Sequence, residues 1–373
     1  MQRMPQPIIF VDSTEKLRKC IQEIEQATRL CADTEFVRTR TYYSNLGLIQ
    51  VSDGKASYVI DIPALEQDDL DSIKACLYSP DIELVFYACS EDLEVLLRAF
   101  GSLPNNFYDL QIGLSLLGED AGQGFSKAVS KHLGIELEKS QTLTDWMMRP
   151  LTEEQLRYAA DDVEYLSLLA DKLFDSLHAQ GRKEWLAEES LHLRERCLLN
   201  TDIRQVYLKA KGLERLNDQQ QRRLIALTEW REKRAQRKNI PRGFVLKDPV
   251  LQDLAKHAPT SVEEVARVAK LDPQRKSALL CELSDLLSDK STSELHLPDM
   301  VPKRSAKDRD LNSMKTHLTN LADEAGIAVS LLARKKDIER YLYTKDSSSH
   351  PLYPQWLNGW RAPFYAQAEA RRQ

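Results

Sequence analysis

Two carboxylates separated by one residue lie inside an apolar run near the amino terminus. Asp33 and Glu35 occur in the sequence CADTEF, within a stretch whose apolar residues predict a β-strand. Side chains at positions i and i+2 of a strand project from the same face, so both carboxylates would converge on one site. Neighbouring anions in a partly buried sheet repel each other unless a proton or a cation lies between them. The pair therefore favours a divalent-metal site over the alternative, a solvent-facing pair at a strand end.

Three further residues could complete such a site, although each also has a structural explanation. Asp92 falls in the first turn of a predicted helix, where the helix dipole alone favours an acid. Tyr158 and Asp162 stand four residues apart in another predicted helix, so a hydroxyl and a carboxylate share one helical face. Each feature is common by itself. The combination of Asp-x-Glu on a strand, an acid on a later helix and Tyr-x-x-x-Asp on another is more specific than its parts.

The sequence around these residues predicts a mixed sheet followed by helices, and these elements would position the five side chains. A hairpin turn is expected at Asp53-Gly54, and an uninterrupted helix is expected from Thr152 onward. Beyond about residue 200 the strand signals fade, which predicts an all-α remainder with a linker over 288–308. The other predicted strands cover 8–11, 30–36 and 84–88, and the other predicted helices cover 14–28, 70–77 and 91–100.

Length and charge both indicate more than one domain. The 373 residues exceed the roughly 250 to 300 at which a single hydrophobic core stops growing. Residues 1–200 carry a formal charge of −14, whereas residues 201–373 carry +9. The basic half could attract a polyanion and the acidic half could hold divalent cations, although charged helix faces in water would give the same asymmetry.

Cysteine spacing and hydropathy predict a cytoplasmic protein. The six cysteines are scattered without a CxxC pair, which favours reduced and mostly buried thiols. No apolar run approaches the roughly 20 residues that cross a bilayer, and the amino terminus lacks the apolar core of a secretion signal. A membrane association is therefore not expected.

Three stretches resemble the ribonuclease D family of the DEDD exonuclease superfamily: DTEFVRTRTYYSNLGLIQ, SEDLEV and TDWMMRPLTEEQLRYAADDVEYL. The resemblance covers residues 8–200 and implies an α/β ribonuclease H-like exonuclease domain with a mixed sheet over 1–200. It also implies that the four family acids are Asp33, Glu35, Asp92 and Asp162. Tyr158 would then mark the tyrosine branch, because Arg157 stands where the histidine branch has its His.

The resemblance implies a metal-dependent hydrolase that removes nucleotides from RNA 3′ ends. Two ions, Mg²⁺ or Mn²⁺, would be held by the acids, with Asp33 shared between them and Asp92 acting through water. Tyr158 would orient the attacking water, since a free tyrosine pKa near ~10 makes positioning a better role than full deprotonation. The implied substrates are transfer RNA precursors and other structured RNAs. A DNA 3′→5′ exonuclease and a non-catalytic RNA-binding scaffold are the alternatives, and the oligomeric state is left open.

The same resemblance suggests which residues contact the substrate, namely Tyr42, Tyr43, Leu46, Gln50 and Arg149. Base stacking and phosphate binding suit these types, but packing of the strand core explains the first four equally well. Trp146 is expected to pack rather than bind. At Tyr87 the sequence departs from many relatives, which have His there.

The carboxy-terminal half resembles one or two all-α helical domains. Residues 211–291 are similar to the helicase and ribonuclease D C-terminal (HRDC) domain, and residues 307–373 look like a divergent second copy or a helical cap on the nuclease domain. A basic cluster could contact phosphates, although a solvated helix face is the alternative. This cluster comprises Arg231, Lys233, Arg234, Arg237, Lys238 and Arg242.

Overall fold

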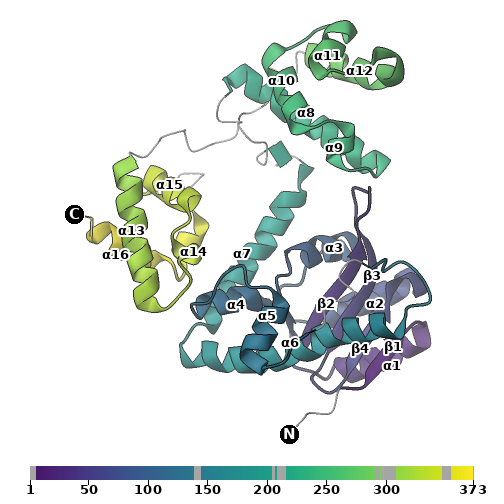
Figure 1. The fold of residues 1–373 in the computed structure, drawn as a ribbon, viewed down its shortest axis with the longest axis vertical. Coiled ribbons are helices and arrows are strands. Elements are labelled where there is room, and N and C mark those ends of the chain that lie inside the picture. The colour runs from purple at the N-terminus through teal and green to yellow at the C-terminus, as the bar shows by residue number, and fades with distance from the viewer. Residues whose placement is uncertain are drawn as a thin grey trace.

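The computed structural model describes residues 6–137, 144–203, 206–207, 216–289, 295, 297, 308–346 and 354–372 (Figure 1). Its first part combines a sheet with flanking helices. In chain order the elements are β1 (Ile8–Val11), α1 (Thr14–Ile24), β2 (Arg29–Val37), β3 (Asn45–Ser52), β4 (Ser57–Asp61), η1 (Ile62–Ala64), α2 (Gln67–Leu77), β5 (Glu83–Phe86), α3 (Ser90–Phe100), β6 (Phe107–Asp109), α4 (Leu110–Leu116), α5 (Phe125–Leu133), α6 (Glu153–Ala179) and α7 (Lys183–Thr201).

The predicted mixed sheet is confirmed. Its strand order is β1-β4-β3-β2-β5-β6, in which β3 runs antiparallel to both β2 and β4. The pairs β1·β4, β2·β5 and β5·β6 are parallel. The predicted hairpin joins β3 to β4, and Gly54 takes the turn conformation with a φ of +83° that most residues avoid. The strand β2 therefore lies in the middle of the sheet.

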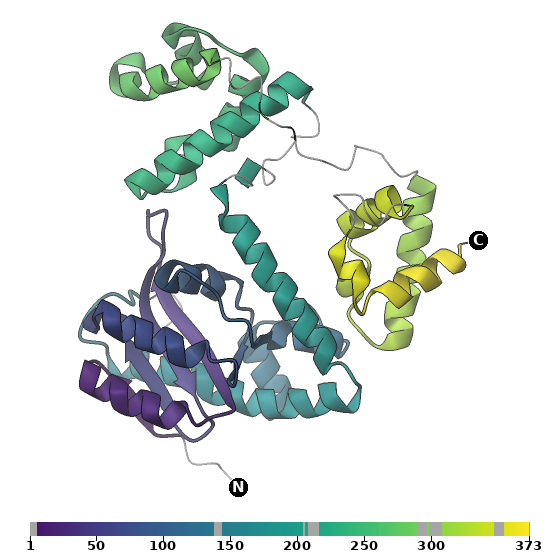
Figure 2. The same ribbon diagram turned by 180° about the vertical axis from the view of Figure 1, so that it is seen from behind.

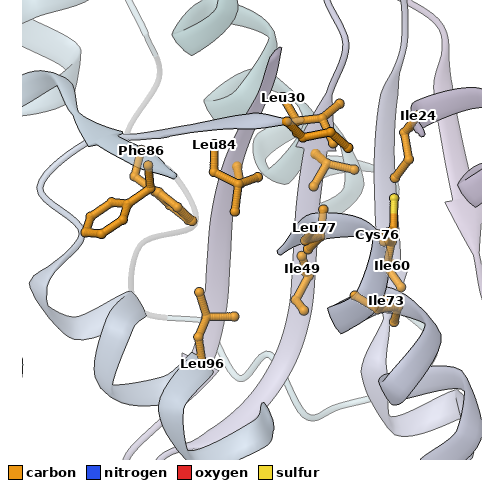
Figure 3. Packing of buried hydrophobic residues seen from close by; sticks show 14 of the residues in the cluster. Ile24, Leu30, Ile49, Ile60, Ile73, Cys76, Leu77, Leu84, Phe86 and Leu96 are labelled. Carbon is orange, nitrogen blue, oxygen red and sulfur yellow. The ribbon is translucent and has the colours of Figure 1, made fainter. Parts of the chain in front are cut away.

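Alternating side chains of the strands build two hydrophobic layers. On one face the core lies between the strands and the helices α1, α2 and α3, with residues such as Leu30, Ile49 and Leu84 (Figure 3). On the other face α6 crosses the sheet and packs against β2, β3 and β4. Ala159 and Ala160 are fully buried there beside Leu48, so the absence of larger side chains lets the helix axis approach the strands closely.

The remaining described elements are helical, as expected. The first group contains α8 (Asp218–Lys238), α9 (Arg242–Val245), α10 (Asp248–His257), α11 (Val262–Ala269) and α12 (Pro273–Ser288), which share one apolar core. The second group contains α13 (Asp308–Ala325), α14 (Val329–Leu332), α15 (Lys335–Thr344), η5 (Gln355–Asn358) and α16 (Ala362–Ala370). Figures 1 and 2 show the first group beyond the far end of α7 and the second group beside the sheet-bearing part.

Several local expectations differ from the structure. The helix α1 ends at Ile24, four residues before the predicted end, because β2 already begins at Arg29 and the connecting turn needs the intervening residues. The strand β6 and the helices α4 and α5 were not foreseen. Most of the predicted linker over 288–308 lies outside the described residues. Five of the six thiols are buried as expected, whereas Cys281 is exposed.

Among the described residues, the helices are too short or too polar for any of them to cross a lipid bilayer.

Candidate active site

Three of the predicted acids meet in space. Carboxylate oxygens of Asp33, Glu35 and Asp162 lie within 4.8 Å of one another. Asp33 and Glu35 extend from one face of β2, and Asp162 comes from α6, which covers that face. The strand alternation predicted from the sequence is therefore confirmed, and the distant Asp162 completes the cluster.

The fourth acid approaches from a different element. Asp92 lies in the first turn of α3, which starts a few residues after β5 ends, and its carboxylate accepts a hydrogen bond from the Thr34 hydroxyl. Thr34 stands between Asp33 and Glu35 on the opposite face of β2, so it connects the acid on α3 to the strand that carries the other two. Asp92 is buried, and its charge raises the pKa of both Asp33 and Glu35.

The sheet leaves the acids accessible at one edge of their strand. The strand β2 pairs with β5 only over 29–31, so Asp33 and Glu35 lie beyond the last paired residue of β5. On the other side they stand opposite Gln50 and Leu48 of β3, and a β-bulge follows between Glu35 and Phe36. Bulges bend a strand locally and commonly occur next to functional sites. The cluster thus occupies the gap where β2 diverges from β5.

Burial and mutual repulsion make the fully ionised cluster costly. Burial, followed by the charges of Asp92, Asp162 and Glu35, raises the pKa of Asp33 well above its usual range. Burial and two neighbouring carboxylates raise the pKa of Glu35 to about 9. Burial is also the main cause that raises the pKa of Asp162 to about 7 and that of Asp92 to about 6. Bound divalent cations would remove this cost.

The donor set fits hard divalent cations. All the converging atoms are carboxylate oxygens, which Mg²⁺, Mn²⁺ and Ca²⁺ prefer, and neither a thiol nor an imidazole belongs to the cluster. Glu188, Glu189 and His192 form a second group of this kind among the described residues. Glu189, however, is neutralised by a buried guanidinium group, that of Arg361.

The electrostatics of the cluster predict how the stability of the metal-free protein changes with pH. Groups whose folded pKa is raised bind protons that the unfolded chain releases, so their stabilising contribution is complete below about pH 4 and is lost as pH rises toward 9. Glu35→Gln removes one such charge. In the presence of a chelator, its melting temperature should exceed that of the wild type by a margin that grows between pH 5 and 9. A margin that stays constant over this range would contradict the account.

The acids open into a cleft of about 610 Å³ that also contains the predicted tyrosine. Tyr158 lies one helical turn before Asp162 on α6, and its ring packs at 6.0 Å from that of Trp146. Trp146 is buried, which confirms its expected structural role. Four of the five residues predicted to form the catalytic site thus lie in the acid cluster or line the cleft beside it, and the fifth, Asp92, is joined to β2 through its hydrogen bond with Thr34.

Other residues of the cleft were missed by sequence reasoning. Phe125 and Lys127 reach it from α5, and Tyr87 reaches it from the end of β5. The rings of Tyr87 and Phe125 lie 5.2 Å apart, and the Tyr87 hydroxyl donates to the carbonyl of Gln123 at 2.6 Å. The sequence offered a signal only at Tyr87, where it departs from the family pattern, because α5 was not predicted at all.

Tyr42 and Tyr43, two of the predicted substrate contacts, lie between β2 and β3 and face the first helical group. The Tyr42 hydroxyl donates to the buried carboxylate of Glu232 on α8, and Gln236 donates back to that hydroxyl at 3.1 Å. The backbone amides of both tyrosines donate to Asn239 Oδ1, each at 3.1 Å. The structure therefore gives these residues an interdomain role, and their contact with substrate stays a prediction.

Two other predicted substrate contacts lie on β3. Leu46 is half-buried and packs against the core on the α1–α3 face. Gln50 is fully buried opposite Asp33, and neither its amide nitrogen nor its amide oxygen has a hydrogen-bond partner within the described structure. Gln50 lies beside Asp33 on the same face of the sheet and is not exposed, so its contact with substrate stays a prediction.

The guanidinium of Arg149 donates its hydrogen bonds to groups of the protein itself. Its guanidinium binds both oxygens of Asp61 at 2.8 and 2.6 Å and donates to the carbonyls of Trp146 and Met148, each at 2.8 Å. A Cβ on Gly47 would stand 2.7 Å from the Trp146 carbonyl, so only glycine allows this segment to lie so close to β3. Arg149 thus anchors the segment before α6, and phosphate binding by it remains a prediction without support from its contacts.

The expectation for the basic cluster is wrong for three of its six members. The guanidinium groups of Arg231 and Arg234 are buried against Asp248 and Glu282, and Arg242 forms a two-contact pair with Glu232 at 2.5 and 2.6 Å. Helical periodicity turns these arginines toward acids of neighbouring helices, which linear sequence could not reveal. Lys233 pairs with Glu229 at 2.6 Å but stays exposed, and Arg237 and Lys238 are exposed as well, so these three members lie at the surface.

The second helical group is anchored to the sheet-bearing part through a buried ion pair. Arg361, on the turn before α16, pairs with Glu189 of α7 through both carboxylate oxygens, and the side chains are only 5% and 3% exposed. Trp360 stacks on Trp185 at 4.7 Å and also donates to Glu189. Residues of this group share an apolar core with α4, α6 and α7. The group therefore packs against the sheet-bearing part, as the alternative of a helical cap expected.

Comparisons with known proteins agree with this architecture. The family described as 3'-5' exonuclease matches residues 8–178, and the HRDC domain matches residues 220–282. The chain is 36% identical over 366 residues to a ribonuclease D of Shewanella sp., covering 97% of this chain and 93% of the relative. It is 32% identical over 375 residues to ribonuclease D of Escherichia coli K12, covering 96% of each.

A solved structure extends the likeness to the whole fold. The crystal structure of Escherichia coli RNase D, described as an exoribonuclease involved in structured RNA processing, superposes with a TM-score of 0.86 at 29% identity. The match covers 99% of this chain and 98% of that chain. The sheet with its flanking helices and both helical groups are thus common to the two proteins. The chain belongs to the ribonuclease D family and is a 3′→5′ exoribonuclease.

Proposed function

We propose that the chain removes nucleotides from RNA 3′ ends by hydrolysis that depends on two divalent cations, Mg²⁺ or Mn²⁺. The observation that carries this proposal is the convergence of Asp33, Glu35 and Asp162, whose oxygens lie within 4.8 Å of one another in the cleft that contains Tyr158. Two-ion sites of this kind hydrolyse phosphodiesters without a covalent nucleophile. The cleft needs no nucleophilic side chain for this chemistry.

Each acid has a distinct task in this proposal. Asp33, Glu35 and Asp162 would hold one ion, while Asp33 and Asp92 would support the second. The ions would supply positive charge that activates water and stabilises the leaving 3′ oxygen. The Thr34 hydroxyl, which donates to Asp92, holds that carboxylate on the β2 side of α3 and so fixes its orientation.

Tyr158 would orient the attacking water toward the terminal phosphodiester. It stands one turn from Asp162 on the same face of α6, and the buried Trp146 ring limits the positions its own ring can take. Tyr158→Phe keeps this packing and removes only the hydroxyl. We expect kcat to fall by roughly 10²-fold with little change in the affinity for RNA. Wild-type kcat in this variant would remove Tyr158 from the mechanism, and Tyr165→Phe on the same helix provides the matched control.

The proposed substrates are transfer RNA precursors and other structured RNAs. The relative from Escherichia coli is described as acting in structured RNA processing, and the HRDC match in residues 220–282 supports a second nucleic-acid-binding region. The domain limits 1–200, 211–291 and 307–373 belong to this proposal. The last two regions share an element order in the structure, because each begins with a long helix, continues through a one-turn helix and a ten-residue helix, and ends with a further helix.

Digestion of an RNA labelled at either end tests the proposed activity. With Mg²⁺, a 3′-labelled RNA should release labelled mononucleotide at once, whereas a 5′-labelled RNA should shorten stepwise. A chelator should stop both reactions. A matched DNA oligomer distinguishes the DNA exonuclease, since only RNA presents the 2′-hydroxyl. Binding without any metal-dependent release of nucleotides would support the non-catalytic scaffold instead.

A further inference from the structure

A second cavity lies where the nuclease domain meets the second helical group. It has a volume of about 380 Å³ and is separate from the catalytic cleft. Its walls come from the start of α3, from α4, from α7 and from the α14–α15 region. The polar side chains that line it include Ser90, Asp109, Glu189, Arg196, Ser330 and Arg334.

The cavity exists only because the second helical group is docked. Ala328 donates its backbone N–H to the carbonyl of Ser115 at 2.7 Å, directly below the cavity. Arg182 donates to the carbonyls of Ala325 and Gly326, the latter at 3.0 Å, and the Glu189–Arg361 pair closes the other side. Arg196 therefore faces Arg334 across a boundary between two parts of the chain.

The charge around this cavity is not balanced. Glu189 forms an ion pair with Arg361, and the Arg334 guanidinium lies 3.6 Å from the carboxylate of Asp337. Arg196, by contrast, makes no hydrogen bond and no ion pair within the part of the chain that the structure describes.

Neighbouring groups leave the charge of Arg196 without a direct counterion. The carboxylate of Asp109 accepts hydrogen bonds from the backbone amides of Ala88, Cys89 and Gln111, and burial raises its pKa. Arg196 and Arg334 both line the cavity and both keep an exposed side to solvent; partial desolvation and then the charge of Arg334 lower the pKa of Arg196, while the charges of Glu189 and Asp337 act in the opposite direction. The two arginines repel each other, and an anion between them would relieve that repulsion.

The cavity is adjacent to the catalytic cleft. Ala121 lines the cavity and Gly124, three residues later, lines the cleft. The segment between them is held by Gln123, whose carbonyl accepts hydrogen bonds from Gln111 on the cavity side and Tyr87 on the cleft side, at 3.0 and 2.6 Å. Ser90 likewise precedes Asp92 by two residues at the start of α3. The cleft and the cavity are therefore separated by only a short segment of chain.

We propose that this cavity binds a backbone phosphate of the RNA several nucleotides upstream of the 3′ end, with Arg196 and Arg334 as the charged contacts. The inference rests on the proposed exoribonuclease function and adds to it a subsite that the second helical group completes. A phosphodiester fits because two guanidinium groups offer paired N–H donors and the hydroxyls of Ser90 and Ser330 can donate as well. The subsite would hold long substrates without reading their sequence.

Kinetics on RNA of different lengths test this subsite in the full-length protein. Arg196→Gln should raise KM for a 12-nucleotide RNA roughly tenfold, which is the effect of removing one charged hydrogen-bond donor, and leave kcat unchanged. The salt dependence of log KM should become shallower by about 0.7 for each phosphate that the protein no longer neutralises. Hydrolysis of a dinucleotide, which is too short to reach the cavity, should stay at the wild-type rate.

Matched variants separate this subsite from general effects. Arg194→Gln removes the same charge from α7 outside the cavity and should keep the wild-type KM for both substrates, whereas Arg334→Gln should resemble Arg196→Gln. Arg196→Lys should recover part of the affinity. The melting temperature of Arg196→Gln should equal or exceed that of the wild type, because a repulsive pair is removed.

Three results would contradict the proposed phosphate subsite. Unchanged KM for the long RNA in Arg196→Gln would do so, as would an equal reduction in the rate on the dinucleotide. Stabilisation of the wild type by inorganic phosphate, with no effect of Arg196→Gln on the long RNA, would assign the cavity to a free anion instead. If the wild type released nucleotides from neither substrate, the exoribonuclease function itself would fail, which is a different outcome.

Discussion

Asp33→Asn is expected to lower kcat for RNA hydrolysis by at least about 10³-fold, the largest effect of any single substitution in the chain. Asp33 lies at the centre of the acid cluster, because Asp92, Asp162 and Glu35 all raise its pKa. The amide keeps the volume of the side chain and removes one negative charge from the metal site. Steady-state kinetics at saturating Mg²⁺ measure this decrease.

A second measurement distinguishes impaired catalysis from impaired folding. In the absence of metal, Asp33→Asn should melt at a higher temperature than the wild type at pH 8, since it relieves repulsion between buried carboxylates. Asp171→Asn is the matched control, because Asp171 lies on α6 like Asp162 but is exposed and pairs with Arg29 outside the cleft. Lower stability together with lower activity in Asp33→Asn would mean that the residue supports the fold.

Arg361→Met is expected to destabilise the docked second helical group by roughly 3 to 5 kcal/mol. The substitution keeps an apolar side chain of similar length but leaves Glu189 buried and without its cation. Although burial alone would raise the pKa of Glu189, its hydrogen bonds and charge interaction with Arg361 hold that pKa below its usual value. Urea unfolding followed by tryptophan fluorescence reports the destabilisation, since Trp185 and Trp360 stack at this interface.

The matching double variant tests whether the ion pair itself is responsible. Glu189→Leu combined with Arg361→Met removes both charges and should recover most of the stability, because no uncompensated charge stays buried. Arg371→Met, at an exposed pair with Glu324, should change the free energy of unfolding by less than about 1 kcal/mol. A destabilisation below about 1 kcal/mol for Arg361→Met would show that apolar packing alone holds the group.

The convergence of the candidate acids was predictable because local geometry determines where their side chains point. Asp33 and Glu35 follow from strand alternation, and Tyr158 with Asp162 follows from helical periodicity, both of which depend on a few adjacent residues. Asp92 was ambiguous by itself, since the first turn of any helix favours an acid. Only the family resemblance selected Asp92, and its place beside Thr34 depends on how α3 packs against β2.

The arginines were harder to predict because their partners are distant in sequence. Arg149 binds Asp61, Arg234 binds Glu282 and Arg361 binds Glu189, so each pairs with an acid at least 48 residues away. From composition alone, such arginines would be assigned to the surface charge that is available to bind RNA. The fold instead uses them to connect elements, and Arg196 differs from them because it is exposed and makes no hydrogen bond or ion pair among the described residues.

Tyr42 and Gln50 show that a sequence motif also does not predict the direction of a side chain. Both lie in the same family-like segment, yet Tyr42 contacts α8 and Gln50 is buried beside Asp33. A linear motif places such residues near the site without showing which way the side chains face. For Gln50 the direction follows from its register opposite Asp33, which requires knowing how β2 pairs with β3.

Calorimetric titration of the metal-free protein with Mn²⁺, at pH 7 and without RNA, tests directly whether the acid cluster binds two divalent cations. The wild type should bind two ions saturably and release protons as it does so, because burial and neighbouring charges raise the pKa of Glu35 to about 9. Asp33→Asn should abolish this binding, while Asp171→Asn should retain it. Equal binding of Mn²⁺ by the wild type and Asp33→Asn would contradict the account.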